Sequence, residues 1–218
     1  MIAKDLINYS IPPLRLTDDV SKAIHWMEEL HLKQLPVLEE KEFKGFIDEA
    51  TILNLKNVYE KVGDYELVAL DCITSVSQHY YDVVRLAYEN ESSLVAVIEN
   101  DEYQGVISVQ DVIEAFAQTA SINSPGGILV LKLKQIDYSL AEISRLIESE
   151  NVKILSSYVS SDENDPTSIS LTLKLNTEDM SRVTATLRRF EYLVEEHSSD
   201  SDGDDKERLE ILLKYLKI

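Results

Sequence analysis

Residues 35–48 read LPVLEEKEFKGFID, and residues 95–108, sixty positions further on, read VAVIENDEYQGVIS. Each stretch holds two short apolar runs separated by polar residues, a pattern that predicts two neighbouring strands joined by a turn. The two stretches align without a gap, so the chain contains an internal repeat with a period of 60 residues. This repeat predicts two copies of one folding unit.

The similarity extends outward from these strands. In each copy the strand pair is preceded by a segment with apolar residues at helical spacing, residues 20–27 in the first copy and 80–87 in the second. Thr17 and Ser77 precede these segments and are the expected N-caps of the two helices. A further helix is expected directly after each strand pair. Each copy should therefore alternate strands and helices in the same order.

The composition is that of a folded and strongly acidic protein. The 218 residues include 40 acidic and 21 basic side chains, a formal net charge of −19, and 44% hydrophobic residues. Such a surface repels phosphate backbones and anionic lipid head groups, so neither nucleic acid nor a membrane is an expected partner. The single cysteine, Cys72, and the absence of a signal-like N-terminus or a long apolar run predict a cytoplasmic protein.

Common signatures of catalysis are missing from the sequence. The six glycines form neither a phosphate loop nor a dinucleotide-binding turn, and no H-E-x-x-H or G-x-S-x-G segment occurs. The four histidines lack metal-ligand spacing. We therefore expect no enzyme activity, no catalytic residue, no metal and no cofactor.

Three features of the repeat resemble the cystathionine-β-synthase (CBS) domain: the β-α-β-β-α order, the Pro36-Val37 pair in a buried strand and the glycine in the following strand. Two such domains in tandem resemble a Bateman module, with repeat 1 at residues 1–60 and repeat 2 at 61–122. The most specific element is the family's ribose-phosphate motif, kept in the second copy as Gly105-Val-Ile-Ser-Val-Gln-Asp111. The resemblance implies that Gly105, Ile107, Ser108 and Asp111 bind a nucleotide, as AMP, ADP, ATP or a related adenosyl compound.

The chemistry of this motif can be interpreted. A serine hydroxyl at a helix N-terminus can donate to a phosphate, and a carboxylate one turn later can accept both ribose hydroxyls. An ordinary N-cap with an acid in the first helical turn is the alternative interpretation of Ser108 and Asp111. The first copy has Asp48 and Thr51 at these positions, with Glu49 beside them, and carboxylates at a helix start repel a phosphate. Only the second copy is expected to bind a nucleotide.

A different pattern begins after the breaker cluster Ser124-Pro-Gly-Gly127. Strands are predicted at residues 128–133, 152–159, 168–175 and 192–195, with a helix capped by Ser139 and another over residues 177–190. This β-α-β-β-α-β order is the ferredoxin-like arrangement and resembles an ACT domain at residues 126–197. The segment Gln135–Tyr138 lacks the glycine typical of amino-acid-binding members, which favours a structural or dimerising role. Tandem CBS domains followed by an ACT domain resemble the acetoin-utilisation regulatory (AcuB-like) proteins.

The chain ends in an acidic linker at residues 198–205 and an apolar-striped helix at 206–218. The fold class is therefore α/β (α+β): a tandem CBS pair, a ferredoxin-like ACT-type domain and a C-terminal helix. Two functions follow. One is a non-catalytic regulatory module that binds an adenosine nucleotide or nucleoside and transmits this to assembly or to a partner. The other is a ligand-free scaffold or dimerisation protein with degenerate sites. The family resemblance and the apolar C-terminal stripe predict a homodimer.

Overall fold

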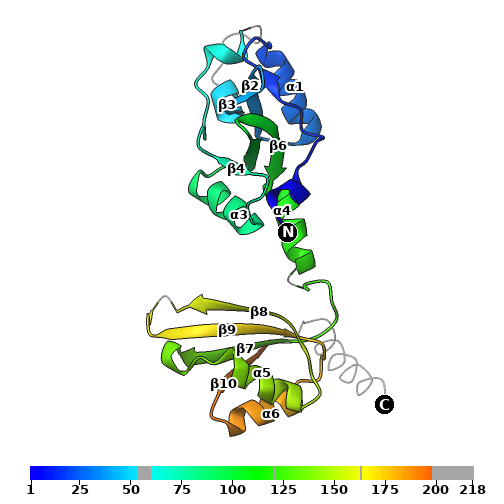
Figure 1. Cartoon of the computed structure of the whole chain (residues 1–218), viewed down its shortest axis with the longest axis vertical. Coiled ribbons are helices and arrows are strands. Elements are labelled where there is room, and N and C mark those ends of the chain that lie inside the picture. The colour runs from blue at the N-terminus through cyan, green and yellow to red at the C-terminus, as the bar shows by residue number, and fades with distance from the viewer. Residues whose placement is uncertain (54–59, 120, 163, 198–218) are drawn as a thin grey trace, which may run out of the picture. The chain divides into compact units, whose positions relative to one another are not determined.

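The computed structural model describes residues 1–53, 60–119, 121–162 and 164–197 (Figure 1). It divides into two compact units, residues 1–116 and the residues from Ala117 onward. The predicted acidic linker and C-terminal helix, residues 198–218, lie outside the described residues.

The first unit contains both copies of the repeat, and the predicted β-α-β-β-α order is confirmed in each. The elements of copy 1 are β1 (Leu14–Arg15), α1 (Val20–Leu30), β2 (Gln34–Glu39), β3 (Glu42–Asp48) and α2 (Glu49–Leu53). Those of copy 2 are β4 (Ile73–Ser75), α3 (Tyr80–Glu89), β5 (Leu94–Glu99), β6 (Glu102–Ser108) and α4 (Val109–Thr119).

The two copies agree even in strand register. In each copy the first strand runs parallel to the second, and the second pairs antiparallel with the third. Val37 lies opposite Gly45, Val97 lies opposite Gly105, and in both copies the register shifts at the next residue. Because apolar residues recur at matched positions, only this register buries them all, and one core is shared by the two copies.

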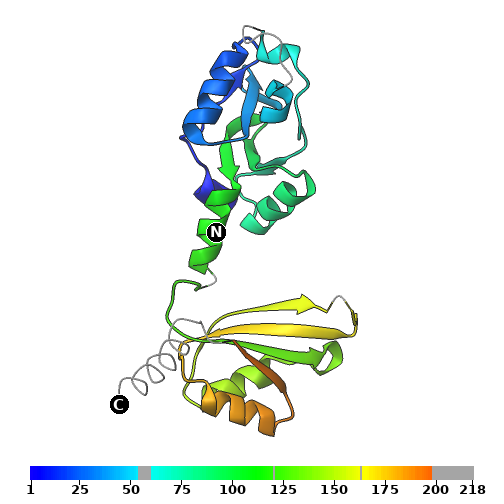
Figure 2. The ribbon, with the colours of Figure 1, turned by 180° about the vertical axis from the view of Figure 1, so that it is seen from behind.

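The segment that precedes each copy crosses to the other copy. The Asn8 backbone N–H donates to the Val106 carbonyl in copy 2 at 2.8 Å, and the Val68 N–H donates to the Phe46 carbonyl in copy 1 at 2.8 Å. In Figures 1 and 2 the N-terminal segment accordingly lies beside β6 and the start of α4. The exchange ties the copies together and brings residues near position 8 to the motif of copy 2.

This exchange also explains an error in the predicted helix caps. The N-cap residues of α1 and α3 are Asp19 and His79, so the prediction of Thr17 and Ser77 was wrong. The first helical N–H of α1 donates to Glu60, and Nδ1 of His79 accepts from an N–H of α3. A crossing segment, distant in sequence, supplies an acceptor that a local hydroxyl was expected to provide.

The second unit is a four-stranded antiparallel sheet in the order β10-β7-β9-β8. Helices α5 and α6 lie together on one face of it (Figures 1 and 2). This confirms the ferredoxin-like arrangement, and β9 alternates buried and half-buried residues as predicted. The elements are β7 (Ile128–Lys134), α5 (Leu140–Ser149), β8 (Ile154–Ser161), β9 (Ser168–Leu175), α6 (Ser181–Arg189) and β10 (Leu193–His197).

One helix of this unit begins later than predicted. The Ser139 hydroxyl caps α5 as expected, accepting from the Glu142 N–H at 3.3 Å. In contrast, α6 begins at Ser181 rather than Thr177. The Thr177 carbonyl is occupied by the Gly127 N–H at 2.7 Å, and Asp179 accepts from the Ser181 N–H. The hydrogen bond from Gly127, which is distant in sequence, and the local bond to Asp179 therefore keep residues 177–180 out of the helix.

Cys72 is fully buried in the core of the first unit. Burial raises the pKa of its thiol from 9.0 to about 11, because the thiolate would lose its hydration. Above pH 9 the unfolded chain ionises this thiol while the folded chain does not, so the free energy of unfolding should fall as pH rises through this window. We expect Cys72→Ala to lose this component, about 1.4 kcal/mol per pH unit, in chemical unfolding compared with wild type. Parallel pH profiles for the two proteins would contradict the prediction.

Candidate functional site

Ser108 and Asp111 bind each other at the start of α4. The Ser108 hydroxyl donates to Oδ2 of Asp111 at 2.5 Å and accepts from the Asp111 N–H at 3.1 Å. The Ser108 N–H donates to Oδ2 of Asp111 at 2.9 Å. This reciprocal arrangement is a capping box, in which the helix satisfies its own terminal donors. Ser108 is buried and Asp111 is half-buried, so the Asp111 side chain is the more accessible of the two.

The N-terminal segment adds a third polar group. The Asn8 amide donates to both carboxylate oxygens of Asp111, at 3.3 and 3.4 Å, and its own oxygen accepts from the Ser10 N–H at 3.0 Å. Tyr9 follows with 78% of its surface exposed. Neither Asn8 nor Tyr9 was predicted from the sequence to belong to the site. The available signal was the repeat itself, since the polar Asn8 corresponds to the apolar Val68, which precedes copy 2 and pairs with copy 1.

Gly105 allows this segment to pass close to β6. Its φ is +152°, a conformation that residues with a side chain rarely adopt, and a Cβ at this position would lie 2.4 Å from Cγ2 of Ile7. A ring carbon of Tyr9 lies 4.0 Å from the same point. Ile107, in contrast, is fully buried in the core of the first unit, so its side chain anchors β6 rather than facing solvent.

Copy 1 has different chemistry at the matching place. Oδ1 of Asp48 accepts from the Thr51 N–H at 2.7 Å, so a carboxylate caps α2 where a serine caps α4. Val68 takes the place of Asn8 and bonds to β3 only through its backbone. Copy 1 therefore presents an acid at the helix start and lacks the amide that reaches Asp111 in copy 2.

Together, the repeated topology, the matched register and the exchanged segments decide the fold of residues 1–116. The first unit has the fold of a tandem CBS pair. The second unit has the ferredoxin-like topology of an ACT-type domain. The amino-acid sequence matches no protein-family model.

Solved structures that contain CBS domains are similar to this chain. A CBS domain pair/ACT domain protein from Thermotoga maritima is 19% identical, with 54% of this chain and 98% of that chain covered and a TM-score of 0.49. The CBSX2 protein, solved in complex with AMP, is 19% identical, with 54% and 96% covered and a TM-score of 0.47. The CBS domains of a transcriptional regulator from Streptococcus pneumoniae are 17% identical, with 52% and 98% covered and a TM-score of 0.46.

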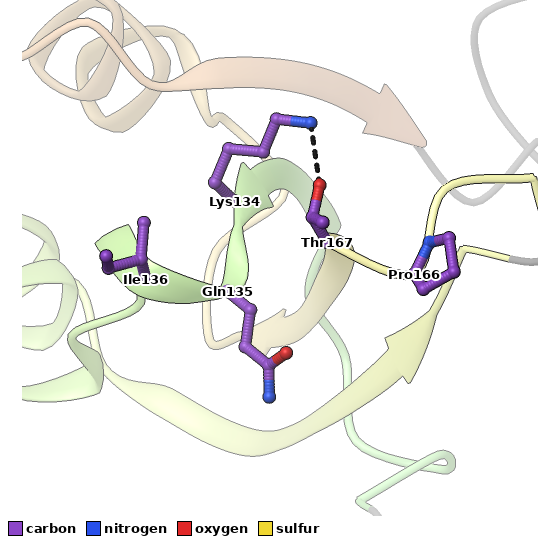
Figure 3. A pocket seen from close by; sticks show the side chains of 5 residues that line it. All are labelled: Lys134, Gln135, Ile136, Pro166 and Thr167. Carbon is purple, nitrogen blue, oxygen red and sulfur yellow. Dashed lines mark hydrogen bonds between the residues drawn. The ribbon is translucent and has the colours of Figure 1, made fainter.

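The ACT-type unit has an open cavity of about 580 Å³ beside the segment Gln135–Tyr138 (Figure 3). Lys134 is the cation at its wall, and its ammonium already donates to Asp165, Thr167 and Ser168 at 2.6, 3.1 and 3.0 Å. The hydrogen bond from Lys134, and further bonds that the Thr167 and Ser168 hydroxyls donate to Asp165, hold the pKa of the Asp165 carboxyl well below its usual range. Ile136 forms an exposed apolar lip. The ammonium of Lys134 and the hydroxyl of Thr167 are thus already paired, and the CBS repeat 2 motif is the stronger candidate site.

Residues 1–53, 60–119, 121–162 and 164–197 contain no group of three or more His, Cys, Asp or Glu side chains placed to hold a metal ion. Within the same ranges, no helix combines the length and the apolar character needed to cross a membrane.

Proposed function

We propose that CBS repeat 2 binds one adenosine nucleotide or nucleoside and that the chain is a non-catalytic regulatory module. The observation that carries the proposal is the meeting of Ser108, Asp111 and Asn8 at the start of α4. This cluster joins a hydroxyl at a helix N-terminus to a partly accessible carboxylate, which are the groups needed for a phosphate and for the two hydroxyls of a ribose.

Ligand binding then exchanges hydrogen bonds rather than only adding them. The Ser108 hydroxyl, which donates to Asp111, turns to donate to the phosphate. Asp111 loses that donor and accepts the ribose hydroxyls in its place. Because each polar group changes partner without becoming unpaired, the exchange avoids the cost of an unsatisfied buried group.

Tyr9 is the side chain that we assign to the base. Its ring is largely exposed and adjoins Gly105, next to the residue whose amide reaches Asp111. Stacking of a base on an aromatic ring contributes roughly 1–3 kcal/mol. Gly105 and Ile107 shape the site without contacting the ligand through side chains: Gly105 admits the N-terminal segment, and Ile107 anchors β6.

We also propose that the chain works as a cytoplasmic homodimer, with ligand binding biasing its assembly or its contact with a partner. Helices α3 and α4 of CBS repeat 2 carry exposed apolar side chains on one turn after another. Copy 1 has polar residues, Ser21 and Glu28, at two of the matching positions of α1. An apolar surface of this kind favours a contact with another protein surface. The side chains are Tyr81, Val84 and Tyr88 on α3, and Val109 and Ile113 on α4.

The test is a calorimetric titration of the full chain with AMP, adenosine and ATP without magnesium. We expect no more than one AMP per chain, because copy 1 presents Asp48 where copy 2 presents Ser108. ATP should bind no tighter than AMP, since the net charge of −19 and the neighbouring Glu114 repel added phosphates. Two sites per chain would refute the assignment to repeat 2.

The alternative is a ligand-free assembly scaffold. The observation that favours it is the closed Ser108–Asp111 pair, which completes a helix cap without any ligand. The same titration separates the two functions: no heat and no thermal stabilisation with any adenosine compound would support the scaffold.

A further inference from the structure

Helix α6 carries a row of exposed arginines, which we call the arginine stripe: Arg182, Arg188 and Arg189. Arg182, the exposed Ala185 and Arg189 follow one another at spacings of three and four residues, which aligns them along one side of the helix. The opposite side of α6 is buried in the core of the second unit. In a chain with a net charge of −19, one solvent-facing helix surface is therefore strongly basic.

The arginine stripe has no acidic partner in the part of the chain that the structure describes. The ion pairs of those residues include none of its three guanidinium groups. Lysines of the same unit differ, because three of them pair with carboxylates at 2.9, 2.6 and 3.1 Å: Lys132, Lys134 and Lys153. Asp179, just before α6, already accepts two hydrogen bonds from Ser181, at 3.1 and 2.6 Å. The stripe is thus able to bind an anionic group.

Strand β10 brings the chain back toward the start of α6. It follows the helix after only three residues, and the Tyr192 N–H donates to the Leu187 carbonyl, so the chain reverses at the end of the helix. β10 then runs in contact with α6 (Figures 1 and 2). The helix and the strand have similar lengths, about 14 and about 16 Å. The strand therefore ends, at His197, near the level of Arg182.

The segment that follows in the sequence has the complementary charge. Residues 198–205 read SSDSDGDD, with four aspartates and no basic residue. In an extended chain alternate residues face the same side, so Asp200, Asp202 and Asp204 would lie in a row about 13 Å long. Arg182 and Arg189, seven residues apart on a helix, are separated by about 10 Å. The row of carboxylates and the arginine stripe therefore match in length as well as in charge.

We propose that residues 198–205 lie along α6 of the same chain, with their aspartates paired to the arginine stripe. An arginine can bind a carboxylate through two parallel hydrogen bonds, which suits such a pairing. A single exposed ion pair contributes little, but several pairs form together here, and the short connection to β10 gives the segment a high effective concentration. In this arrangement the segment closes the stripe, so α6 binds another acidic partner only when the segment is displaced.

Disulfide trapping in the full chain tests the contact. Ala185 lies in the middle of the stripe and Asp202 lies in the middle of the aspartate row, so Ala185→Cys combined with Asp202→Cys places two thiols face to face. Under mild oxidation at low salt we expect roughly tenfold more intrachain disulfide from this protein than from a matched control. Peptide mapping by mass spectrometry identifies the link, and wild type controls for the buried Cys72.

The matched control combines Asp202→Cys with Ser156→Cys. Ser156 lies three strands across the sheet from His197, about 14 Å away, because the register aligns His197, Ile128, Lys174 and Ser156. The five residues from His197 to residue 202 span up to about 17 Å, so chain length alone allows this link. Equal linking in the two double-cysteine proteins would overturn the proposal. A 185–202 link formed mainly between mixed single-cysteine proteins would overturn it too, because the segment would then bind a second copy.

Two further arms test the role of charge. Adding Arg182→Gln and Arg189→Gln should abolish the preference for the 185–202 link, whereas Lys132→Gln with Lys153→Gln removes the same charge elsewhere in the unit and should leave it. Raising the salt concentration from about 0.1 to about 1 M shortens the Debye length from about 10 to about 3 Å and should also abolish the preference. A preference that survives either the arginine changes or high salt contradicts the proposal. None of these outcomes depends on whether a nucleotide binds the first unit.

Discussion

Asp111→Ala should weaken AMP binding at least about 100-fold, because two hydrogen bonds to a charged acceptor contribute roughly 1.5–3 kcal/mol each. The carboxylate of the candidate site can accept both ribose hydroxyls, and Asp111 is half-buried rather than fully buried. A titration calorimeter measures this directly. A loss of less than about tenfold, near 1.4 kcal/mol, would contradict the ribose role of Asp111.

The control for this experiment comes from the repeat itself. Thr51 occupies the position of Asp111 in copy 1, and Thr51→Ala should leave AMP affinity within about twofold, far below the change expected at Asp111. Asp111 also caps α4 through bonds to Ser108, so Asp111→Ala can lower stability. Asp111→Asn keeps the shape and an acceptor oxygen, and should still lose most of the affinity while thermal unfolding verifies the fold. A larger loss of AMP affinity from Thr51→Ala than from Asp111→Ala would place the nucleotide site in copy 1 instead.

Gly105→Ala should lower the free energy of unfolding by roughly 2–5 kcal/mol, the sum of backbone strain at positive φ and a steric clash. The added methyl group would meet Cγ2 of Ile7 at 2.4 Å, in a segment held to β6 by a backbone bond from Asn8. The N-terminal segment must therefore shift away, and AMP affinity should fall with it. Chemical unfolding and titration of the same protein measure both effects.

A double-mutant cycle separates the two causes. Ile7→Ala removes the atom that a Cβ on Gly105 would meet, so in its presence the clash is relieved while the strain of a positive φ remains. The cost of Gly105→Ala should therefore be smaller in the Ile7→Ala background. Equal costs in the two backgrounds would show that Ile7 is not the obstacle.

Local sequence patterns predicted most of the architecture. The period of 60 residues predicted two like units, and the spacing of apolar residues predicted their strands and helices, because each copy must bury its apolar residues in the same way. The clean alternation of residues 168–175 predicted a strand with one buried face, and the structure confirms it. The motif of copy 2 could also be recognised from the sequence, because Ser108 and Asp111 are one helical turn apart and hydrogen-bond to each other locally.

The residues that surround the motif could not be predicted in this way. Asn8 lies 103 positions from Asp111 and reaches it only because the leading segment of each copy crosses to the other. The same crossing gives α1 an acceptor from Glu60, which is why the predicted hydroxyl caps failed. The position of β8 at the edge of its sheet likewise depends on the strand order, which no local pattern contains.

The sequence by itself determined the repeat, the two fold types and the placement of Ser108 and Asp111 together at one helix start, because these depend on spacing within one element or one turn. Only the tertiary structure decided which copy each leading segment pairs with and why Gly105 must lack a side chain. It also decided which strand forms the edge of the sheet in the second unit. Those features depend on backbone groups that meet across long sequence separations, where hydrogen bonding and close packing, rather than local periodicity, select the partner.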